Sequence, residues 1–331
     1  MSKKGARPIA TIGSLLVSGA LLLTLYRSLN LRLVAQALLQ TDKIWLVISV
    51  GMIVPITYLR AVRFYWVAPR GALPGTLEAF RLTLVASALN VFLPAKAGDL
   101  AKGYFIATRS STSPGVAIAI VVYERLCDLF ALITWCVIGW VVGRPQVTGI
   151  PRAFWPALAA VGALCFVLIF FERSGGLVRT IARWMLPRHH RLRKLHELAD
   201  GWPGLLRTLG GRRRWIVGYS LVLWLTHLIQ IWLFTFALSV SVPFTVATSL
   251  SAVALMAGQI PFTFAGLGAR DVVLVVLLGR YMTPESAAAM GVLISTRGLL
   301  PPLIGLPILR PYLTSVVDDA QRWRQKGETV P

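Results

Sequence analysis

The chain has 331 residues, of which 56% are hydrophobic and only 14% are charged, and its formal net charge is +21 at pH 7. A soluble domain carries roughly a quarter charged residues, so the composition excludes an ordinary water-soluble domain. Nucleic-acid binding is not expected either, because the basic residues lie in loops and at the ends of apolar segments without a recognition motif. We therefore predict one all-α integral membrane domain over residues 1–331.

Six apolar segments are predicted to cross the membrane, because each approaches or exceeds the roughly 20 residues that span a hydrocarbon core. They are residues 8–26, 44–60, 115–143, 153–171, 215–239 and 285–309. The basic residues before the first segment also suit a signal peptide, but no small-residue cleavage site precedes Arg27. An uncleaved first span is therefore the favoured interpretation.

Two further apolar segments, 77–109 and 244–280, are interrupted near their middles by breaking residues. These are Asn90, Pro94 and Gly98 in the first segment, and Gln259, Pro261, Gly266 and Gly268 in the second. The apolar arms on either side are shorter than the roughly 20 residues of a full span, which is typical of re-entrant segments. We predict two re-entrant broken-helix hairpins, whose irregular backbone must be buried in protein or face a watery cavity.

Four basic regions are predicted to lie on the cytoplasmic side, where Lys and Arg are in excess. They are the N-terminus, the segment with Arg60, Arg63 and Arg70, the loop 172–214 and the tail 311–331. The loop contains eleven Lys or Arg residues against three acids, so an anionic leaflet would attract it. Both termini are therefore expected in the cytoplasm.

The two halves of the chain share a pattern. Residues 60–143 and 240–310 each contain a broken hairpin and then a span that begins with proline and carries an arginine. Under the predicted topology the second unit enters from the opposite side, as in the inverted repeats of transporters that bind substrate near the midplane. In both halves an aspartate after the break precedes the arginine by 26 positions, and these pairs are Asp99 with Arg125 and Asp271 with Arg297.

Charged side chains within or beside the apolar segments are the candidate substrate-binding residues. A charge at the bilayer centre costs at least about 2.5–3.5 kcal/mol, so it must pair or face water, and such residues are functional by default. The candidates are Lys96, Asp99, Lys102, Glu124, Arg125, Asp128, Arg270, Asp271 and Arg297. Two structural alternatives remain open. Glu124, Arg125 and Asp128 can neutralise one another within one helix, and the lysines can snorkel to the interface.

Other polar residues are assigned structural roles. His227 and Gln230, three positions apart, are expected to form hydrogen bonds between helices. Cys127, Cys136 and Cys165 match no metal or redox motif and are expected to pack as small hydrophobic residues. We find neither a nucleophile with its base nor a metal-binding or nucleotide-binding motif, so no catalytic residue, metal site or cofactor is predicted.

Two motifs in this order carry a family resemblance. The stretch 93–104, Leu-Pro-Ala-Lys-Ala-Gly-Asp-Leu-Ala-Lys-Gly-Tyr, is followed by Tyr-Glu-Arg-Leu-Cys-Asp at 123–128, and the second break, 260–271, is followed by Arg297. Over roughly residues 10 to 310 the chain resembles the lysylphosphatidylglycerol synthase transmembrane, or flippase-like, family. That family includes the membrane half of the multiple peptide resistance factor. Its first break more often reads Pro-Gly-Arg-x-Gly-Glu, so the resemblance implies lipid translocation without naming the lipid.

The favoured function is therefore a flippase that moves a charged-head-group lipid through a polar groove at the midplane. An aminoacyl phospholipid, a hopanoid or a polyprenyl-linked sugar would suit the resemblance. Expected partners are membrane lipids and a separate lipid-modifying enzyme, in a bacterial inner membrane. The alternatives are a membrane-embedded lipid-linked transferase, a secondary transporter of a small solute, and an accessory subunit for a glycosyltransferase.

Overall fold

The protein is described here from a computed structural model. It describes residues 6–147, 150–178, 180, 192–259 and 267–326. Within these ranges the side chains of residues 6–12, 14–15, 94–96, 192–196 and 317–326 are not described. The described residues form helices and connecting loops without a strand, which confirms the all-α prediction.

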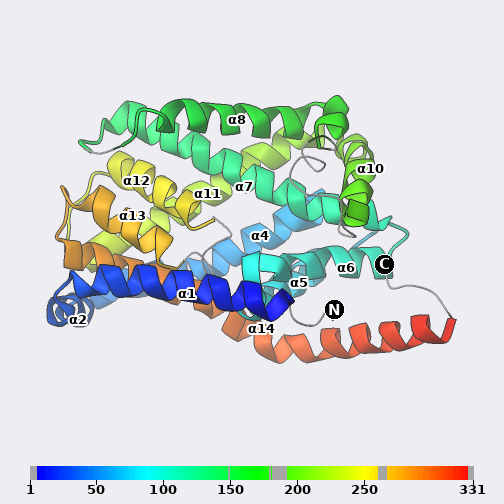
Figure 1. Cartoon of the computed structure of the whole chain (residues 1–331), viewed down its shortest axis with the longest axis horizontal. Helices are drawn as coiled ribbons and strands as arrows, with labels where there is room; N and C mark the ends of the chain where they lie inside the picture. Colours follow the sequence, from blue (N-terminus) through cyan, green and yellow to red (C-terminus); the bar gives the residue numbers. More distant parts are fainter. Residues whose placement is uncertain (1–5, 148–149, 179, 181–191, 260–266, 327–331) are drawn as a thin grey trace.

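The helices follow one another in fifteen described elements, two of them short 3₁₀ turns. In chain order they are α1 (Ala6–Arg27), α2 (Leu31–Leu39), α3 (Lys43–Gly51), α4 (Ile53–Val67), α5 (Thr76–Phe92), η1 (Pro94–Asp99), α6 (Leu100–Arg109), α7 (Pro114–Gly143), α8 (Phe154–Phe170), η2 (Glu172–Ser174), α10 (Leu192–Leu209), α11 (Arg212–Ala237), α12 (Phe244–Ala257), α13 (Ala269–Leu278) and α14 (Pro284–Lys326). Most of them run along the long axis of the molecule (Figure 1).

Four stretches of the described chain are long and apolar enough to cross a membrane. They are Lys43–Val67, Pro114–Gly143, Arg212–Ala237 and Pro284–Val316. A fifth is possible where α8 meets Glu172–Val178 at a bend of 110°. These agree in place with five of the six predicted spans. The remaining predicted span, 8–26, is helical in α1, but its crossing of the membrane stays a prediction.

One boundary in the sequence analysis was wrong. The helix that begins at Lys43 continues to Val67, so Arg60 and Arg63 lie inside it and not in a cytoplasmic loop. Arg63 is only 2% exposed. The apolar and aromatic residues around these two arginines extend the helix, and Arg63 finds buried carboxylate partners on α7, so the arginines do not mark a helix end.

The two interrupted segments each form a helix, a break and a second helix. In the first, α5 ends at Phe92 and η1 leads into α6, so Asn90 belongs to the last turn of α5, not to the break. Gly98 packs closely on α5, because a Cβ there would lie 2.5 Å from the Ala86 carbonyl oxygen. In the second, α12 ends at Ala257 and α13 begins at Ala269. Pro261 and Gly266 lie outside the described residues.

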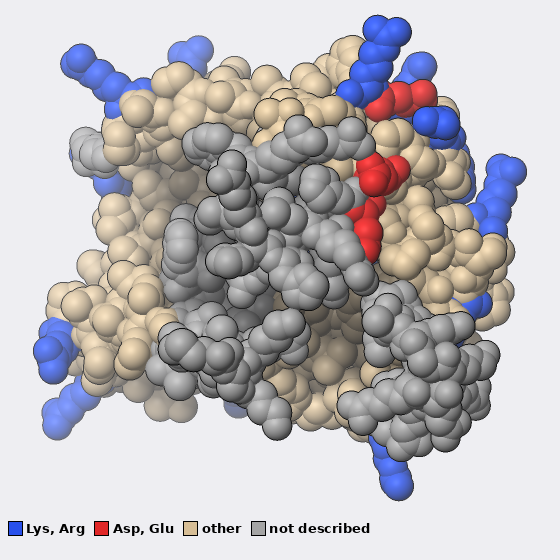
Figure 2. Space-filling view, turned by 45° about the vertical axis from the view of Figure 1, so that its right-hand side comes forward, with Lys and Arg blue, Asp and Glu red and all other residues tan. Residues whose placement is uncertain are grey.

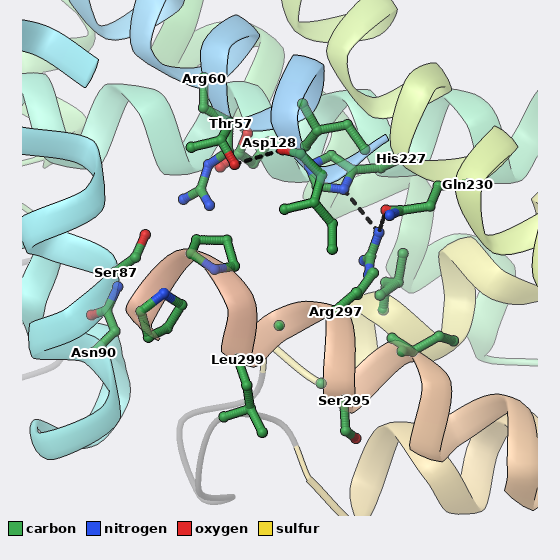
Figure 3. A pocket seen from close by; sticks show the side chains of 18 of the residues that line it. Thr57, Arg60, Ser87, Asn90, Asp128, His227, Gln230, Ser295, Arg297 and Leu299 are labelled. Atoms are coloured by element: carbon green, nitrogen blue, oxygen red, sulfur yellow. Dashed lines mark hydrogen bonds between the residues drawn. The ribbon is translucent and has the colours of Figure 1, made fainter. Parts of the chain in front are cut away.

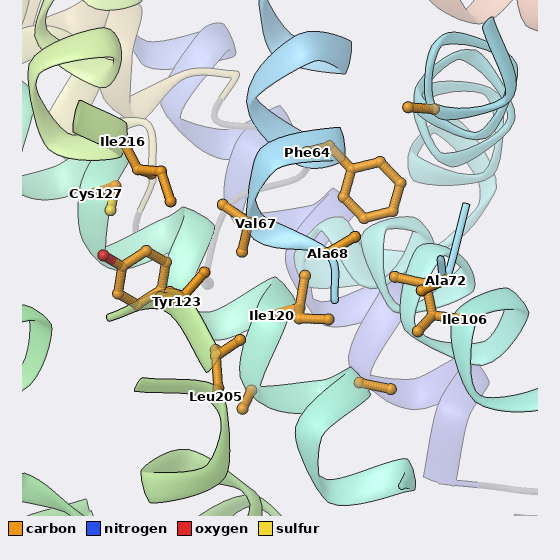
Figure 4. Packing of buried hydrophobic residues seen from close by; sticks show 14 of the residues in the cluster. Phe64, Val67, Ala68, Ala72, Ile106, Ile120, Tyr123, Cys127, Leu205 and Ile216 are labelled. Atoms are coloured by element: carbon orange, nitrogen blue, oxygen red, sulfur yellow. The ribbon is translucent and has the colours of Figure 1, made fainter. Parts of the chain in front are cut away.

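The two broken pairs lie toward opposite ends of the molecule. Figure 1 shows α12 and α13 in its left half and α5 and α6 in its right half. Each pair has its own apolar core. One core joins α4–α7 with α10 and α11 around Phe64, Tyr123 and Trp202 (Figure 4). The other joins α11–α14 around Phe234, Leu250 and Met290.

The outer surface of several helices is apolar. Large hydrophobic side chains are exposed on α3, α4, α7, α11 and α14, among them Ile44, Val54, Val141, Val222 and Leu303. Figure 2 shows Lys and Arg side chains projecting near the left and right sides of its view, with other residue types over much of the described surface between them. An extended apolar exterior with charges toward its ends is what a lipid-embedded helical protein requires.

The predicted basic loop and tail are partly helical. Within 172–214, α10 packs against α7, where Gly115 and Gly201 allow the two backbones to touch. Residues 311–326 of the predicted tail are not separate from the last span, because α14 continues to Lys326. The cytoplasmic location of the loop and the tail, beside an anionic membrane leaflet, stays a prediction.

Candidate functional site

A cavity of about 340 Å³ has residues of both broken pairs, α5 of the first and α12 and α13 of the second, in its wall. Helices α4, α5, α7, α11, α12, α13 and α14 line it, together with Gln259 and Leu267 from the two sides of the second break. Four arginines face it against one carboxylate, and these residues are Arg60, Arg125, Arg270, Arg297 and Asp128. Charged side chains at depth must pair or face water, so the partner of each of these charges bears on its role.

The first break is held by an ion pair between Asp99 and Arg125. Asp99 is buried and immediately precedes α6, and its carboxylate contacts the Arg125 guanidinium of α7. Asn90 Nδ2 of α5 donates to the same carboxylate at 3.2 Å. A carboxylate is favoured at a helix N-terminus, so Asp99 links three elements around the break.

Behind this pair lies a buried chain of ion pairs that joins α4, α6 and α7. Arg63 Nη1 donates to Asp128 Oδ1 at 2.5 Å, and its Nε lies 3.6 Å from Glu124 Oε1. Lys102 Nζ donates to Glu124 Oε2 at 3.2 Å. Trp224 Nε1 of α11 adds a hydrogen bond of 2.8 Å to Asp128. Each charged side chain in this series of ion pairs therefore contacts a side chain of opposite charge.

The second break is held by a pair of adjacent residues, Arg270 and Asp271, and not, within the described ranges, by an ion pair between two helices. Asp271 lies in the first turn of α13, and its Oδ2 accepts from the backbone N–H of Gly268, whose φ of 87° suits glycine. Its Oδ1 accepts from Arg270 Nη2 at 2.6 Å. The same guanidinium nitrogen donates to Ser295 Oγ and to the Gly291 carbonyl of α14 at 2.6 and 3.1 Å. Arg270 and Asp271 thus fasten α13 to α14.

Arg297 is held by neutral groups. Its Nη1 donates to Gln230 Oε1 at 2.5 Å and approaches His227 Nδ1 at 3.1 Å (Figure 3). Gln230 Nε2 in turn donates to the Ser49 carbonyl of α3 at 2.7 Å. These contacts confirm that His227 and Gln230 form hydrogen bonds between helices. They also show that the two equally spaced Asp–Arg pairs differ, because no ion pair joins Asp271 to Arg297 among the described residues.

Arg60 is the least satisfied charge of the cavity. It is half-buried on α4, and the described part of the chain offers its guanidinium neither a hydrogen bond nor an ion pair within contact distance. Figure 3 shows its guanidinium entering the cavity beside Thr57 and Asp128. Sequence reasoning missed this residue by placing it in a loop. Reading the apolar run 56–67 as helix would have found it.

The structure brings most of the predicted site residues together. Arg125, Asp128, Arg270 and Arg297 line the cavity, while Asp99, Lys102, Glu124 and Asp271 are buried partners of cationic side chains. The Lys96 side chain lies outside the described part. Glu124, Arg125 and Asp128 pair with residues of other helices, so they do not form a self-neutralising cluster of their own.

Two further observations bear on chemistry. Cys127, Cys136 and Cys165 are buried free thiols, as expected for small hydrophobic residues. Across the described residues, no group of three or more His, Cys, Asp or Glu side chains is placed to hold a metal ion.

Comparison with known proteins gives one family. The family model described as "Lysylphosphatidylglycerol synthase TM region" matches residues 11–305. A UPF0104 membrane protein of Methanocaldococcus jannaschii is 20% identical over 336 residues, covering 95% of this chain and 96% of the relative. A second UPF0104 membrane protein, from Methanothermobacter thermautotrophicus, is 24% identical over 220 residues, covering 61% of this chain and 65% of the relative.

Proposed function

The chain belongs to the family of the lysylphosphatidylglycerol synthase TM region, and from this premise we propose that it moves a lipid with a charged head group between membrane leaflets. The head group would enter the cavity while the acyl chains stay in the bilayer. Ligand pockets of roughly 300–1,000 Å³ are typical of small-molecule sites, and the cavity of about 340 Å³ is at the lower end of that range.

The observation that carries this proposal is an exposed apolar side chain in the wall of the cavity. Leu299 of α14 lines the cavity and is also 52% exposed, close to the exposed Leu303 one turn later. A site that reaches the lipid-facing surface suits a substrate whose tails remain in lipid. A transporter of a small solute would need a cavity closed to the bilayer.

The placement of the breaks supports a symmetric mechanism. Helix breaks near a central site are typical of transporters built from inverted repeats, in which one repeat rocks against the other. The Asp99–Arg125 and Arg270–Asp271 pairs hold the two breaks, and α5–α6 and α12–α13 lie toward opposite ends. We propose that these two units open the cavity alternately to each leaflet.

Reconstituted protein tests the proposal directly. Purified chain in liposomes should move a fluorescent phospholipid from the inner to the outer leaflet, measured by chemical quenching of the outer leaflet. Arg125→Ala should abolish this transfer, because it leaves Asp99 buried without its partner and alters the cavity wall. Arg310→Ala, at an exposed position of α14, is the matched control and should keep full transfer.

Insertion must be checked separately. Both variants should enter the membrane and elute as the parent does in detergent, and Arg125→Lys should recover part of the transfer. Normal transfer by properly folded Arg125→Ala would refute this role for the cavity. Absence of transfer by the parent chain for lipids of every head-group charge would refute the proposed function itself.

A further inference from the structure

We propose that the cavity selects a phosphate-bearing head group with net negative charge, and that Arg60 and Arg297 bind its phosphate. This inference rests on the proposed function and names the chemical class of its substrate. A cationic aminoacyl lipid would not be selected by such a cavity, because its positively charged amines outnumber its phosphate.

The buried network carries more cationic side chains than carboxylates. Its cationic side chains are Arg60, Arg63, Lys102, Arg125, Arg270 and Arg297, and its carboxylates are Asp99, Glu124, Asp128 and Asp271. Each carboxylate is taken by a cation other than Arg60 and Arg297. Two positive charges therefore face the cavity without a carboxylate of their own among the described residues.

Arg297 is held through only one of its three guanidinium nitrogens among the described contacts. Its contacts with His227 and Gln230 both use Nη1, and the described residues offer no acceptor to its Nε or Nη2. Neutral partners fix the orientation of a guanidinium but leave its charge uncompensated. An arginine held in this way is prepared to donate to a further acceptor from the cavity.

Arg60 and Arg297 face the same cavity from two different helices. The two residues come from α4 and α14, which lie on different walls of one cavity, and both are half-buried. Figure 3 shows Arg60 entering the space from one side, while Arg297 rises from α14 at the other. An anion between these walls could accept from both guanidinium groups.

Phosphate is the anion that this arrangement fits. Arginine presents rigid forked donors that match phosphate oxygens and is weakly hydrated, so it is the preferred cation for buried phosphate recognition. An unpaired charge in an apolar surrounding is costly, and a bound phosphate would relieve two such charges together. An added ammonium group would instead meet the excess positive charge, so it should be rejected.

Binding is tested with the full chain in phosphatidylcholine nanodiscs. The probes are short-chain phosphatidylglycerol, short-chain phosphatidylcholine, lysyl-phosphatidylglycerol and glycerol 3-phosphate, with affinity measured by native mass spectrometry for lipids and calorimetry for the solute. Phosphatidylglycerol should bind most tightly. Arg60→Gln and Arg297→Gln should each weaken it about tenfold or more, since a hydrogen bond to a charged group is worth about that factor.

Control variants separate this site from general surface charge. Arg70→Gln and Arg310→Gln remove exposed arginines near α4 and on α14 and should leave the affinity unchanged. Arg60→Lys keeps the charge and should bind more tightly than Arg60→Gln, which a merely structural role of Arg60 would not predict. Each variant must elute as a monodisperse species.

The outcomes distinguish this inference from the proposed function. Equal or tighter binding of phosphatidylcholine or lysyl-phosphatidylglycerol, with no effect of the two arginine variants, would overturn the anion site while leaving lipid transfer standing. Binding of glycerol 3-phosphate alone, with the same arginine dependence, would support the anion site and overturn the lipid as its source. Selective, arginine-dependent binding of phosphatidylglycerol would support both.

Discussion

Arg297 on α14 donates a hydrogen bond of 2.5 Å to Gln230 on α11. The equally spaced Arg125 in the first half contacts a carboxylate, that of Asp99. The difference has a physical consequence, because a carboxylate cancels the charge of its arginine and an amide does not. At these two equivalent positions, the second half of the chain therefore leaves a positive charge in the cavity, whereas the first half neutralises it.

Gln230→Glu should convert this bond into an ion pair. The side chain keeps its shape and the Arg297 contact, so the protein should fold, although the donor to the Ser49 carbonyl is lost. The new charge should lower the affinity for phosphatidylglycerol about tenfold, comparable to one lost charged hydrogen bond. Gln36→Glu on the exposed face of α2 is the control. Unchanged affinity in Gln230→Glu would contradict the role given to the Arg297 charge.

Arg63→Met should strongly destabilise the protein. Removing one member of a buried ion pair leaves a carboxylate without compensation and costs about 3–5 kcal/mol, and here both Asp128 and Glu124 lose a cation. Replacing Asp128 by Leu as well should recover much of that loss, because an apolar pair of similar volume is often tolerated. Thermal unfolding in detergent measures Arg63→Met, Asp128→Leu and the double variant.

A double-mutant cycle makes this prediction specific. The coupling between positions 63 and 128 should be favourable and larger than the coupling between Arg109 and Glu78, an ion pair with a half-exposed arginine at the ends of α6 and α5. Exposed pairs contribute only about 0–1 kcal/mol. Equal coupling at the two sites would mean that the pair of Arg63 and Asp128 is not sheltered from water.

Much of the architecture follows from patterns visible in the sequence. Long apolar runs locate the spans, and the Pro and Gly residues of 94–98 and the glycine at 268 locate the breaks. Asp99 and Asp271 could be placed at helix starts because they follow those breaks directly. The sequence also indicates which charges are buried, since a charge in the middle of an apolar run has nowhere else to go.

The pairing of those charges could not be read from the sequence. Arg125 and Asp128 lie three apart on one helix, yet each contacts a different helix, because helix packing decides which side chains meet. Arg60 and Arg63 were misplaced because arginines at the end of an apolar run usually mark the membrane surface. Here the helix continues past them, and the partners of Arg63 come from 61 and 65 residues away on α7.

Gly201→Ala should loosen α10 from α7. A Cβ at Gly201 would collide with the backbone of Gly115 and Val116, and backbone cannot move aside as a side-chain end can. We expect a loss of about 1–3 kcal/mol, as for other overpacked contacts, with faster proteolysis of the segment 172–214. Gly218→Ala on α11 meets no atom within 4 Å and should be neutral or stabilising. Equal proteolysis of the two variants would argue against this contact.

Thiol labelling tests the orientation of the chain. Arg70→Cys and Gln146→Cys place single thiols at exposed positions before α5 and after α7, whereas the three native cysteines are buried. Under the predicted topology, position 70 faces the cytoplasm and position 146 faces outward, because α7 crosses between them. A membrane-impermeant maleimide added to intact cells should therefore label Gln146→Cys and reach Arg70→Cys only after permeabilisation. The reverse labelling would invert the proposed direction of both repeats, and labelling of both positions in intact cells would show that α7 does not cross as proposed.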